Sequence, residues 1–287
     1  MIQERERIFD IAITATGRVL LLRDLLLGMI GRGGRIVTPQ AVVSRHAIRS
    51  GNQTLDALFV KPIANNARAS VLICHGIGET VGNWLAVQQL LAANGVASLV
   101  FDYCGYGRSS GFFSSSQSEL DALSAFACLE RLTTPLPVSI LGFSLGSGIA
   151  AAIIHKVPAH RLVLCAAFTS LRKAAASIGF PKVLVSLTPP VWDARDALRN
   201  CPVPVHVVHG ERDRLFPVRM ARELLAFCGS RAELVIVPTV AHNQPLRRPQ
   251  LSYWETIGSW LLAADGAPAI IVRSEIPKSG PGAPGPS

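Results

Sequence analysis

One serine of this sequence lies in a pattern that could make it a nucleophile. Ser144 is the centre of a Gly-x-Ser-x-Gly motif at residues 142–146, between an apolar run at 138–141 and a segment rich in Ala, Ile and Gly. A strand, a sharp turn and a helix in this order form a nucleophile elbow, with the serine at the tip of the turn. Gly142 and Gly146 lack a Cβ, so the strand and the helix can approach each other closely. The alternative is an ordinary glycine-rich turn between a strand and a helix.

A serine hydroxyl needs a base that takes its proton, and the base needs a third group that orients it. Asp213 follows an apolar run at residues 203–209, and His242 follows the last such run, at 234–237. We therefore predict that Ser144, Asp213 and His242 form a catalytic triad, in the chain order that this strand-turn-helix setting requires. Glu211 is an alternative acid, although the Gly-x-x-Asp spacing favours Asp213.

The other acidic residues and histidines receive structural roles. Asp193 and Asp196 are interpreted as surface or helix-cap residues, and His209 as a buried, hydrogen-bonded histidine. His75 ends an apolar run, and we expect it to shape a loop near the pocket rather than to act as the base. Four further histidines have no catalytic partners around them in the sequence: His46, His155, His160 and His206.

The negative oxygen of a tetrahedral intermediate needs hydrogen-bond donors. The backbone N–H of Leu145, directly after the serine, is expected to supply one of them. The backbone N–H of Ile77, in the loop after the apolar run at residues 70–74, is expected to supply the other. This assignment depends on position in the chain alone.

Apolar runs alternate with helical segments along most of the chain, which predicts an α/β fold with a mostly parallel sheet covered by helices on both faces. Alternation around Gly51-Asn52 predicts an antiparallel hairpin at the edge of the sheet. About eight strands are expected, at residues 42–48, 54–60, 70–74, 96–103, 138–141, 161–166, 203–209 and 234–237. The main helices are expected at residues 83–94, 117–132, 218–228 and 250–264. The candidate residues all follow strands, and active sites of such sheets lie at the carboxyl ends of the strands.

Three segments are predicted along the 287 residues. Residues 1–38 form an apolar, amphipathic N-terminal helix, residues 39–265 the α/β domain, and residues 266–287 a Pro/Gly-rich flexible tail. Asp10, Arg18, Arg23 and Asp24 argue against a membrane-spanning helix, since each buried charge costs about 2.5–3.5 kcal/mol at the bilayer centre. We favour docking of the N-terminal helix on the domain or on a second subunit, with an interfacial membrane helix or an active-site flap as alternatives. Within the domain, residues 168–200 depart from the strand–helix rhythm and are predicted to form a short lid.

The composition indicates neither a nucleic-acid partner nor a metal site. The formal net charge is +9, but the basic residues are scattered and Arg247-Arg248 is their only adjacent pair. The six cysteines form no C-x-x-C pair and their spacings do not suit zinc, so free thiols in a reducing cytoplasm are the simplest interpretation. The N-terminus lacks the pattern of a secretory signal. We expect no cofactor and a cytoplasmic location, with membrane association through the N-terminal helix left open.

The ordered motifs resemble the α/β-hydrolase superfamily, and within it the serine-aminopeptidase-like, "α/β-hydrolase domain-containing" group of small-lid serine hydrolases. The motifs are His-Gly-Ile-Gly-Glu at 75–79, Asp-Tyr-Cys-Gly-Tyr-Gly-Arg-Ser at 102–109, Gly-Phe-Ser-Leu-Gly at 142–146, His-Gly-Glu-Arg-Asp at 209–213, and His242. The match covers roughly residues 40 to 265. Cys104 is a departure, because relatives often carry Arg there; it affects a loop and not the triad.

These observations predict a metal-independent serine hydrolase that cleaves a carboxylic ester through an acyl-enzyme. Apolar lid residues indicate an acyl chain or another apolar group in the substrate, unless they are part of the core: Phe180, Val183, Leu184, Leu187 and Trp192. Cleavage of an amide, a peptide or a thioester at the same site is the first alternative. A catalytically idle, membrane-associated binding scaffold is an alternative of another class. An aspartate nucleophile, as in dehalogenases, is disfavoured because a serine occupies the elbow.

Overall fold

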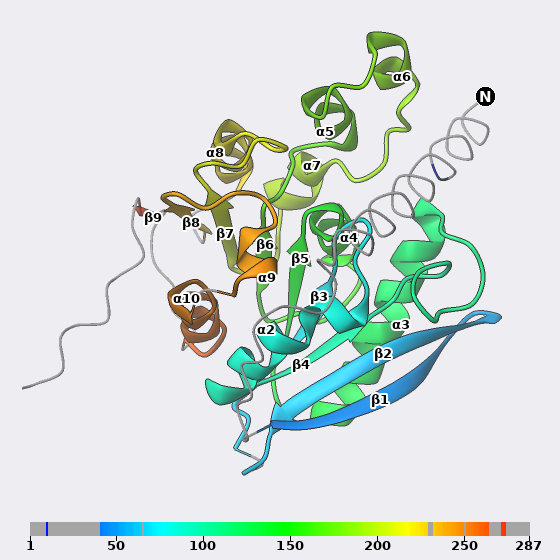
Figure 1. Ribbon diagram of the computed structural model, residues 1–287, viewed down its shortest axis with the longest axis vertical. Helices are drawn as coiled ribbons and strands as arrows, with labels where there is room; N and C mark the ends of the chain where they lie inside the picture. The colour runs from blue at the N-terminus through cyan, green and yellow to red at the C-terminus, as the bar shows by residue number, and fades with distance from the viewer. Residues whose placement is uncertain are drawn as a thin grey trace, which may run out of the picture.

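The computed structural model describes Asp10 and residues 41–64, 66–228, 232–249, 251–263 and 271–273. Nearly all of the predicted N-terminal helix and most of the predicted tail lie outside these residues. Among the described residues, nine strands form one sheet in the order β1-β2-β4-β3-β5-β6-β7-β8-β9. Helices cover both faces of this sheet (Figure 1), which confirms the predicted fold class.

The antiparallel part of the sheet is the predicted edge hairpin. β1 (Ala41–Ser50) pairs with β2 (Gln53–Pro62) around a two-residue turn, and Gly51 in this turn has a φ of 55°. β2 also pairs antiparallel with β4. The remaining pairs are parallel. The parallel strands are β3 (Ala69–Cys74), β4 (Val96–Phe101), β5 (Val138–Phe143), β6 (Leu162–Cys165), β7 (Val205–Gly210), β8 (Ala232–Val237) and β9 (Ile271–Arg273).

The strand β9 differs from the sequence-based expectation. We expected about eight strands, whereas Ile271–Arg273 adds a ninth that pairs with β8. It lies inside the segment that was assigned to the tail, where the sequence has an isolated apolar patch. The patch is too short to indicate a strand by its own pattern, so only the neighbouring edge of β8 identifies it.

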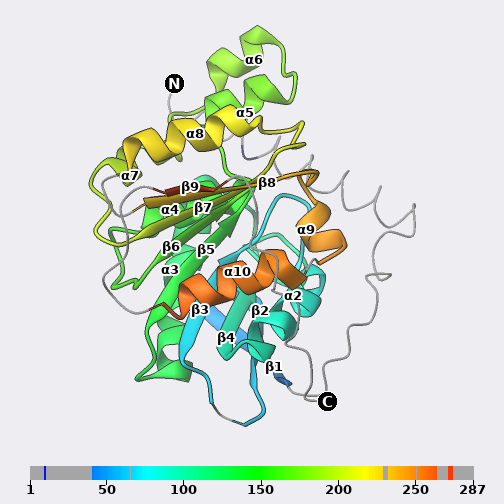
Figure 2. The ribbon, with the colours of Figure 1, turned by 90° about the vertical axis from the view of Figure 1, so that its left-hand side faces the viewer.

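The helices bury two separate apolar layers against the sheet. Every residue of β3 to β8 is buried, as is typical of parallel strands covered on both faces. α2 (Val81–Ala93) and α10 (Leu251–Leu261) lie side by side on one face, where the rings of Trp84 and Trp254 meet edge to face at 5.9 Å (Figure 2). α3 (Ser115–Thr133), α4 (Leu145–Ile153) and α8 (Val218–Phe227) pack on the other face.

The predicted lid, residues 168–200, contains three short helices. They are α5 (Leu171–Ser177), α6 (Lys182–Leu187) and α7 (Ala194–Arg199). α5 and α6 stand at one end of the molecule in both views (Figures 1 and 2). Pro181 precedes α6, and the Asp193 side chain caps α7 by accepting the N–H of Arg195.

The apolar lid residues differ in how far they are buried. Trp192 is a core residue, whose ring meets that of Phe113 at 6.4 Å. Val183 is 70% exposed, whereas Phe180 and Leu187 are half-buried. The side chain of Leu184 lies outside the described part of the structure. No helix within the described residues is long and apolar enough to cross a membrane.

The elbow depends on glycines where β5, α4 and β3 approach each other. A Cβ on Gly146 would overlap the carbonyl oxygen of Cys74 and lie 2.7 Å from that of His75. A Cβ on Gly142 would lie 2.5 Å from the carbonyl oxygen of Gly146. All these neighbours are backbone atoms, so they cannot move aside without displacing a strand or the helix.

We therefore predict that Gly146→Ala lowers the free energy of unfolding by about 3 kcal/mol, the upper end of the usual cost of overpacking. Gly82→Ala is the matched control, since a Cβ at this helical position would meet nothing closer than the Thr80 hydroxyl at 3.8 Å. The free energy of unfolding of this control should rise by about 0.5–1 kcal/mol, because alanine is more favourable than glycine in a helix. Urea unfolding of both variants measures the difference. Equal stability of the two variants would contradict the close approach at the elbow.

Candidate active site

Ser144 occupies the turn between β5 and α4 in a conformation that few non-glycine residues adopt. Its φ and ψ are 52° and −118°. Its N–H donates to the carbonyl oxygen of Cys165 at 3.0 Å, and its own carbonyl accepts the hydroxyl of Ser147 at 2.6 Å. Such strained residues persist only where their surroundings hold them, and they cluster at functional sites. The structure thus has the strand, turn and helix expected around this serine.

The loops after β7 and β8 bring an imidazole and a carboxylate to this hydroxyl. His242 follows β8, and its Nε2 lies 2.9 Å from the Oγ of Ser144. The Nδ1 of the same ring lies 2.7 Å from the Oδ2 of Asp213, in the loop after β7. All three residues are buried. A carboxylate oxygen can only accept, so Nδ1 carries the proton and Nε2 is left as the acceptor for the serine hydroxyl.

The carboxylate of Asp213 is fixed by its own loop. Its Oδ1 accepts the backbone N–H groups of Leu215 at 2.9 Å and of Phe216 at 2.8 Å. One oxygen is therefore held by the backbone, and the other faces His242. This division determines the orientation of the carboxylate before any substrate is present.

His209 supports the same loop, as predicted for a buried, hydrogen-bonded histidine. Its Nε2 lies 2.7 Å from the carbonyl oxygen of Phe216 and 3.5 Å from the Oδ2 of Asp213. Burial lowers the pKa of His209, which outweighs the opposing effects of the Phe216 carbonyl and the nearby carboxylate. A neutral His209 holds the loop by donating its N–H to that carbonyl.

Aromatic rings surround the imidazole of His242. The ring of Phe216 meets it edge to face at 5.1 Å, and the ring of Phe143 lies 5.7 Å away. Phe168 packs in turn on Phe216 at 5.5 Å. These rings restrict the orientation of the imidazole and keep water from much of its surroundings, which strengthens the polar contacts that it makes.

The predicted oxyanion donors lie on the two segments next to Ser144. Leu145 is the first residue of α4, and a helix leaves its first backbone N–H groups without intrahelical acceptors. The loop with Ile77 passes close to the serine, since a Cβ on Gly76 would lie 3.3 Å from the Cβ of Ser144. Both segments therefore border the space beside the hydroxyl.

The competing residues lie elsewhere. Glu211 is exposed at the start of the Asp213 loop, while Asp213 is the acid that contacts His242. Asp193 caps α7, and Asp196 is exposed with its side chain 3.8 Å from Arg199. Three of the four histidines without catalytic partners in the sequence make contacts away from Ser144: His46 with Ser44, His155 with the carbonyl of Ala197, and His206 with the ring of Trp260.

The cysteines are part of the packing. All six are free, and Cys74 and Cys165 are buried in strands, as predicted. Burial raises the pKa of both thiols to about 12. Within the described residues, no group of three or more His, Cys, Asp or Glu side chains is arranged to hold a metal ion.

One polar pair near the site was not predicted. Asp102, directly after β4, lies with its Oδ1 3.7 Å from the Nε2 of His75, and both side chains are buried. Asp121 of α3 is likewise buried and accepts the Cys104 N–H at 2.8 Å and the Ser50 hydroxyl at 2.6 Å. The position of Asp102 at the carboxyl end of a strand was a usable signal, whereas nothing in the sequence indicates the partners of Asp121.

Comparison with known proteins finds a family model and several relatives that are similar to part of this chain. Residues 65–193 match a family model described as "Serine aminopeptidase, S33". An uncharacterized protein of Mycobacterium tuberculosis is 29% identical over 179 residues, which span 61% of this chain and 63% of the relative. The zebrafish (Danio rerio) "Lysophosphatidylserine lipase ABHD12" is 28% identical over 192 residues, or 60% of this chain and 50% of the relative. The chain thus matches between half and two thirds of the length of these curated relatives.

Solved structures share the fold at lower identity. The esterase domain of a Rhodothermus marinus protein superposes with a TM-score of 0.61 at 17% identity, over 76% of this chain and 97% of that one. The Pyrococcus furiosus esterase Pf2001 has a TM-score of 0.61 at 19% identity, over 77% of this chain and 90% of that one. The chain therefore shares the fold of these esterases.

The hydrogen bonds of Asp213 predict the effect of one substitution. In Asp213→Asn the amide carbonyl should face Leu215 and Phe216, because their N–H groups need an acceptor, and the NH2 group should then face His242. The imidazole would carry its proton on Nε2 and could not accept one from Ser144. We expect kcat for p-nitrophenyl butyrate to fall about 10⁴-fold, as for a triad with the wrong tautomer.

Glu211→Gln in the same loop is the control and should keep kcat within about 2-fold of the wild type, since surface changes away from such contacts have small effects. Steady-state kinetics of both purified variants measure this. A larger loss in Glu211→Gln than in Asp213→Asn would make Glu211 the acid instead.

Proposed function

We propose that the protein is a serine hydrolase that cleaves carboxylic esters through a covalent acyl-enzyme. The observation that carries this proposal is the pair of hydrogen bonds that joins the Ser144 hydroxyl, the His242 imidazole and the Asp213 carboxylate. A relative named as a lysophosphatidylserine lipase and structural neighbours named as esterases support ester cleavage in particular. The proposed roles are nucleophile for Ser144, general base and acid for His242, and orienting carboxylate for Asp213.

The first half of the reaction forms the acyl-enzyme. The Oγ of Ser144 attacks the ester carbonyl carbon while the Nε2 of His242 takes the hydroxyl proton. The carbonyl oxygen becomes negatively charged, and the N–H groups of Leu145 and Ile77 stabilise it. When the tetrahedral intermediate collapses, the bond to the alkoxide breaks, and the imidazolium of His242 gives its proton to the leaving alcohol.

The second half releases the acid. A water molecule takes the place of the alcohol, and His242 accepts one of its protons as the oxygen attacks the acyl carbon. The bond to Ser144 then breaks, and the serine recovers its proton from His242. The Asp213 carboxylate stabilises the imidazolium in both halves. No metal ion or cofactor is needed for either step.

The walls of the site favour an apolar acyl group. Phe143 and Phe216 lie beside the imidazole, Phe168 packs on Phe216, and Leu145 follows the nucleophile. Burial of apolar surface contributes roughly 25 cal/mol for each Å² removed from water, so such walls bind a hydrocarbon chain better than a charged group.

Amide hydrolysis at the same site is the second candidate. The match to the serine aminopeptidase family model is the observation that favours it. The same serine, imidazole and oxyanion donors would serve an amide, because the two reactions differ in the leaving group and its need for a proton. A comparison of substrates distinguishes the two candidates.

We predict that a fluorophosphonate probe labels the wild-type protein at Ser144 and that Ser144→Ala is not labelled. The exposed Ser116→Ala on α3 is the control and should be labelled like the wild type. The wild type should cleave p-nitrophenyl esters in preference to aminoacyl p-nitroanilides, with higher kcat/KM for medium acyl chains than for acetate. Labelling that persists in Ser144→Ala, or a preference for the anilides, would overturn the ester proposal.

A further inference from the structure

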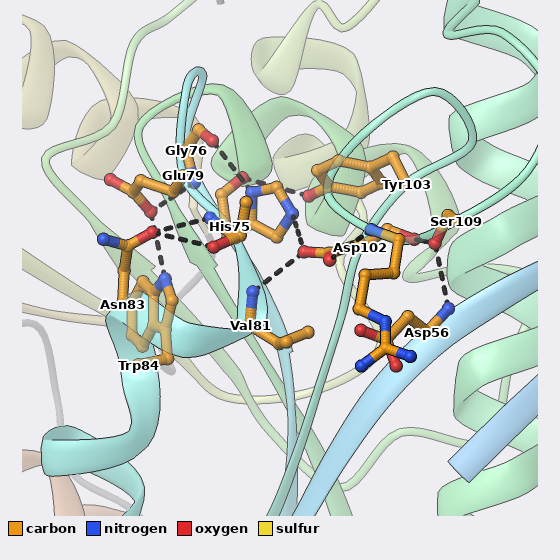
Figure 3. A network of polar contacts seen from close by, with 12 residues as sticks. Asp56, His75, Gly76, Glu79, Val81, Asn83, Trp84, Asp102, Tyr103 and Ser109 are labelled. Carbon is orange, nitrogen blue, oxygen red and sulfur yellow. Dashed lines mark hydrogen bonds and ion pairs between the residues drawn. The ribbon is translucent and has the colours of Figure 1, made fainter. Parts of the chain in front are cut away.

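His75 is a fully buried histidine in direct contact with the loop that borders Ser144. It follows β3, and its ring lies 4.5 Å from that of Tyr103 and 5.6 Å from that of Tyr106. Its Nδ1 lies 2.8 Å from the carbonyl oxygen of Gly76. Figure 3 shows this ring at the centre of a network of polar contacts. The reaction proposed above uses no part of the His75 side chain.

The bond to Gly76 has a consequence for the next residue. The carbonyl of Gly76 and the N–H of Ile77 belong to the same peptide unit, which is planar. In a trans peptide these two groups point in opposite directions, so an anchor on the carbonyl also determines the direction of the N–H. The Gly76 carbonyl also accepts the N–H of Glu79 at 3.4 Å, so the His75 ring makes the shorter of the two contacts that fix the orientation of this proposed oxyanion donor.

The peptide unit on the other side of Gly76 is held as well. The N–H of Gly76 donates to the Oε2 of Glu79 at 2.8 Å, and the indole N–H of Trp84 donates to the same oxygen at 3.0 Å. The hydroxyl of Tyr103 donates to the carbonyl of His75 at 3.0 Å. With both of its peptide units anchored, Gly76 cannot rotate and reorient the Ile77 N–H without breaking one of these hydrogen bonds.

Asp102 joins the two ends of this loop. Its Oδ1 lies 3.7 Å from the Nε2 of His75 and accepts the N–H of Val81, the first residue of α2, at 2.8 Å. Its Oδ2 faces the N–H of Arg108 at 3.4 Å. The loop between β3 and α2 thus begins and ends against a single carboxyl group.

Burial determines the charge of the histidine. It lowers the pKa of His75 to about 4, with a smaller opposing effect from the Gly76 carbonyl, and raises the pKa of Asp102 to about 6. The imidazole is therefore neutral at neutral pH. Because the Gly76 carbonyl can only accept, the single ring proton lies on Nδ1.

We propose that His75 is a positioning residue that aims the Ile77 N–H at the oxyanion by holding the Gly76 carbonyl. This inference rests on the serine-hydrolase function proposed above. It assigns to the histidine no contact with the substrate, and its effect appears mainly in the tetrahedral state, when the oxyanion forms.

The test compares His75→Ala and His75→Asn with the wild type. We expect His75→Ala to lower kcat for a p-nitrophenyl ester about 100-fold, the lower end for loss of one oxyanion donor, with KM within about 3-fold. The Ki of a trifluoromethyl ketone, which forms a tetrahedral adduct with a negative oxygen, should rise by the same factor as kcat/KM falls. The kcat of His75→Asn should be at least about 10-fold higher than that of His75→Ala, because the amide NH2 of the asparagine can reach the Gly76 carbonyl.

The control is His206→Ala, a buried histidine in the interior of β7, away from the carboxyl ends of the strands. It should lower the melting temperature with little change in kcat or in the Ki of the ketone. If His75→Ala behaves like His206→Ala, the histidine is merely structural and the inference is wrong.

A measurement on the wild type keeps the test independent of how the variants fold. Nitrogen-15 NMR of labelled histidines should show His75 as the neutral Nδ1–H tautomer, and an Nε2–H tautomer would contradict the proposal. The wild type and Ser144→Ala are assayed beside the variants. A wild type with neither turnover nor labelling at Ser144 would overturn the proposed function itself, whereas an active wild type matched by His75→Ala would overturn this inference alone.

Discussion

The hydrogen-bonded line through the imidazole of His242 is the interaction on which the rest of the structure depends. It joins Ser144 to a histidine 98 positions later and to an aspartate 29 positions before that histidine. Three loops can meet in this way because β5, β7 and β8 are parallel and end at the same edge of the sheet. The elements that hold these strands in register are therefore also needed for the chemistry.

The surroundings of this line restrict each member before a substrate arrives. Backbone N–H groups of one loop donate hydrogen bonds to an oxygen of Asp213. Two phenylalanine rings pack against His242, and the elbow holds Ser144 at a positive φ. Groups that are fixed in advance need no reorganisation during the reaction, which is the main source of electrostatic catalysis. The cost is backbone strain at the serine, which the close packing around Gly142 and Gly146 maintains.

Much of this arrangement could be predicted from the sequence, and the reasons differ from residue to residue. The strands from 70–74 to 234–237 were identifiable because strands buried on both faces are continuous apolar runs, and Ser144, Asp213 and His242 follow such runs within a few residues. The contact of His75 with Asp102 was not predicted, because they lie 27 positions apart and only the pairing of β3 with β4 makes them neighbours. The three lid helices are short and separated by prolines, so they have too few turns for a helical periodicity to be visible. β9 was missed for the same reason, since three residues carry no pattern without the strand beside them.

The central claim is that Ser144 attacks the substrate while Leu145 and Ile77 hold the resulting oxyanion. A crystal structure of the protein after reaction with an alkyl fluorophosphonate tests it most directly. The account predicts phosphorus bonded to the Oγ of Ser144, with the phosphonyl oxygen within about 3 Å of both backbone nitrogens and His242 still bonded to Asp213. An adduct on another residue, or a phosphonyl oxygen directed away from both nitrogens, would contradict it.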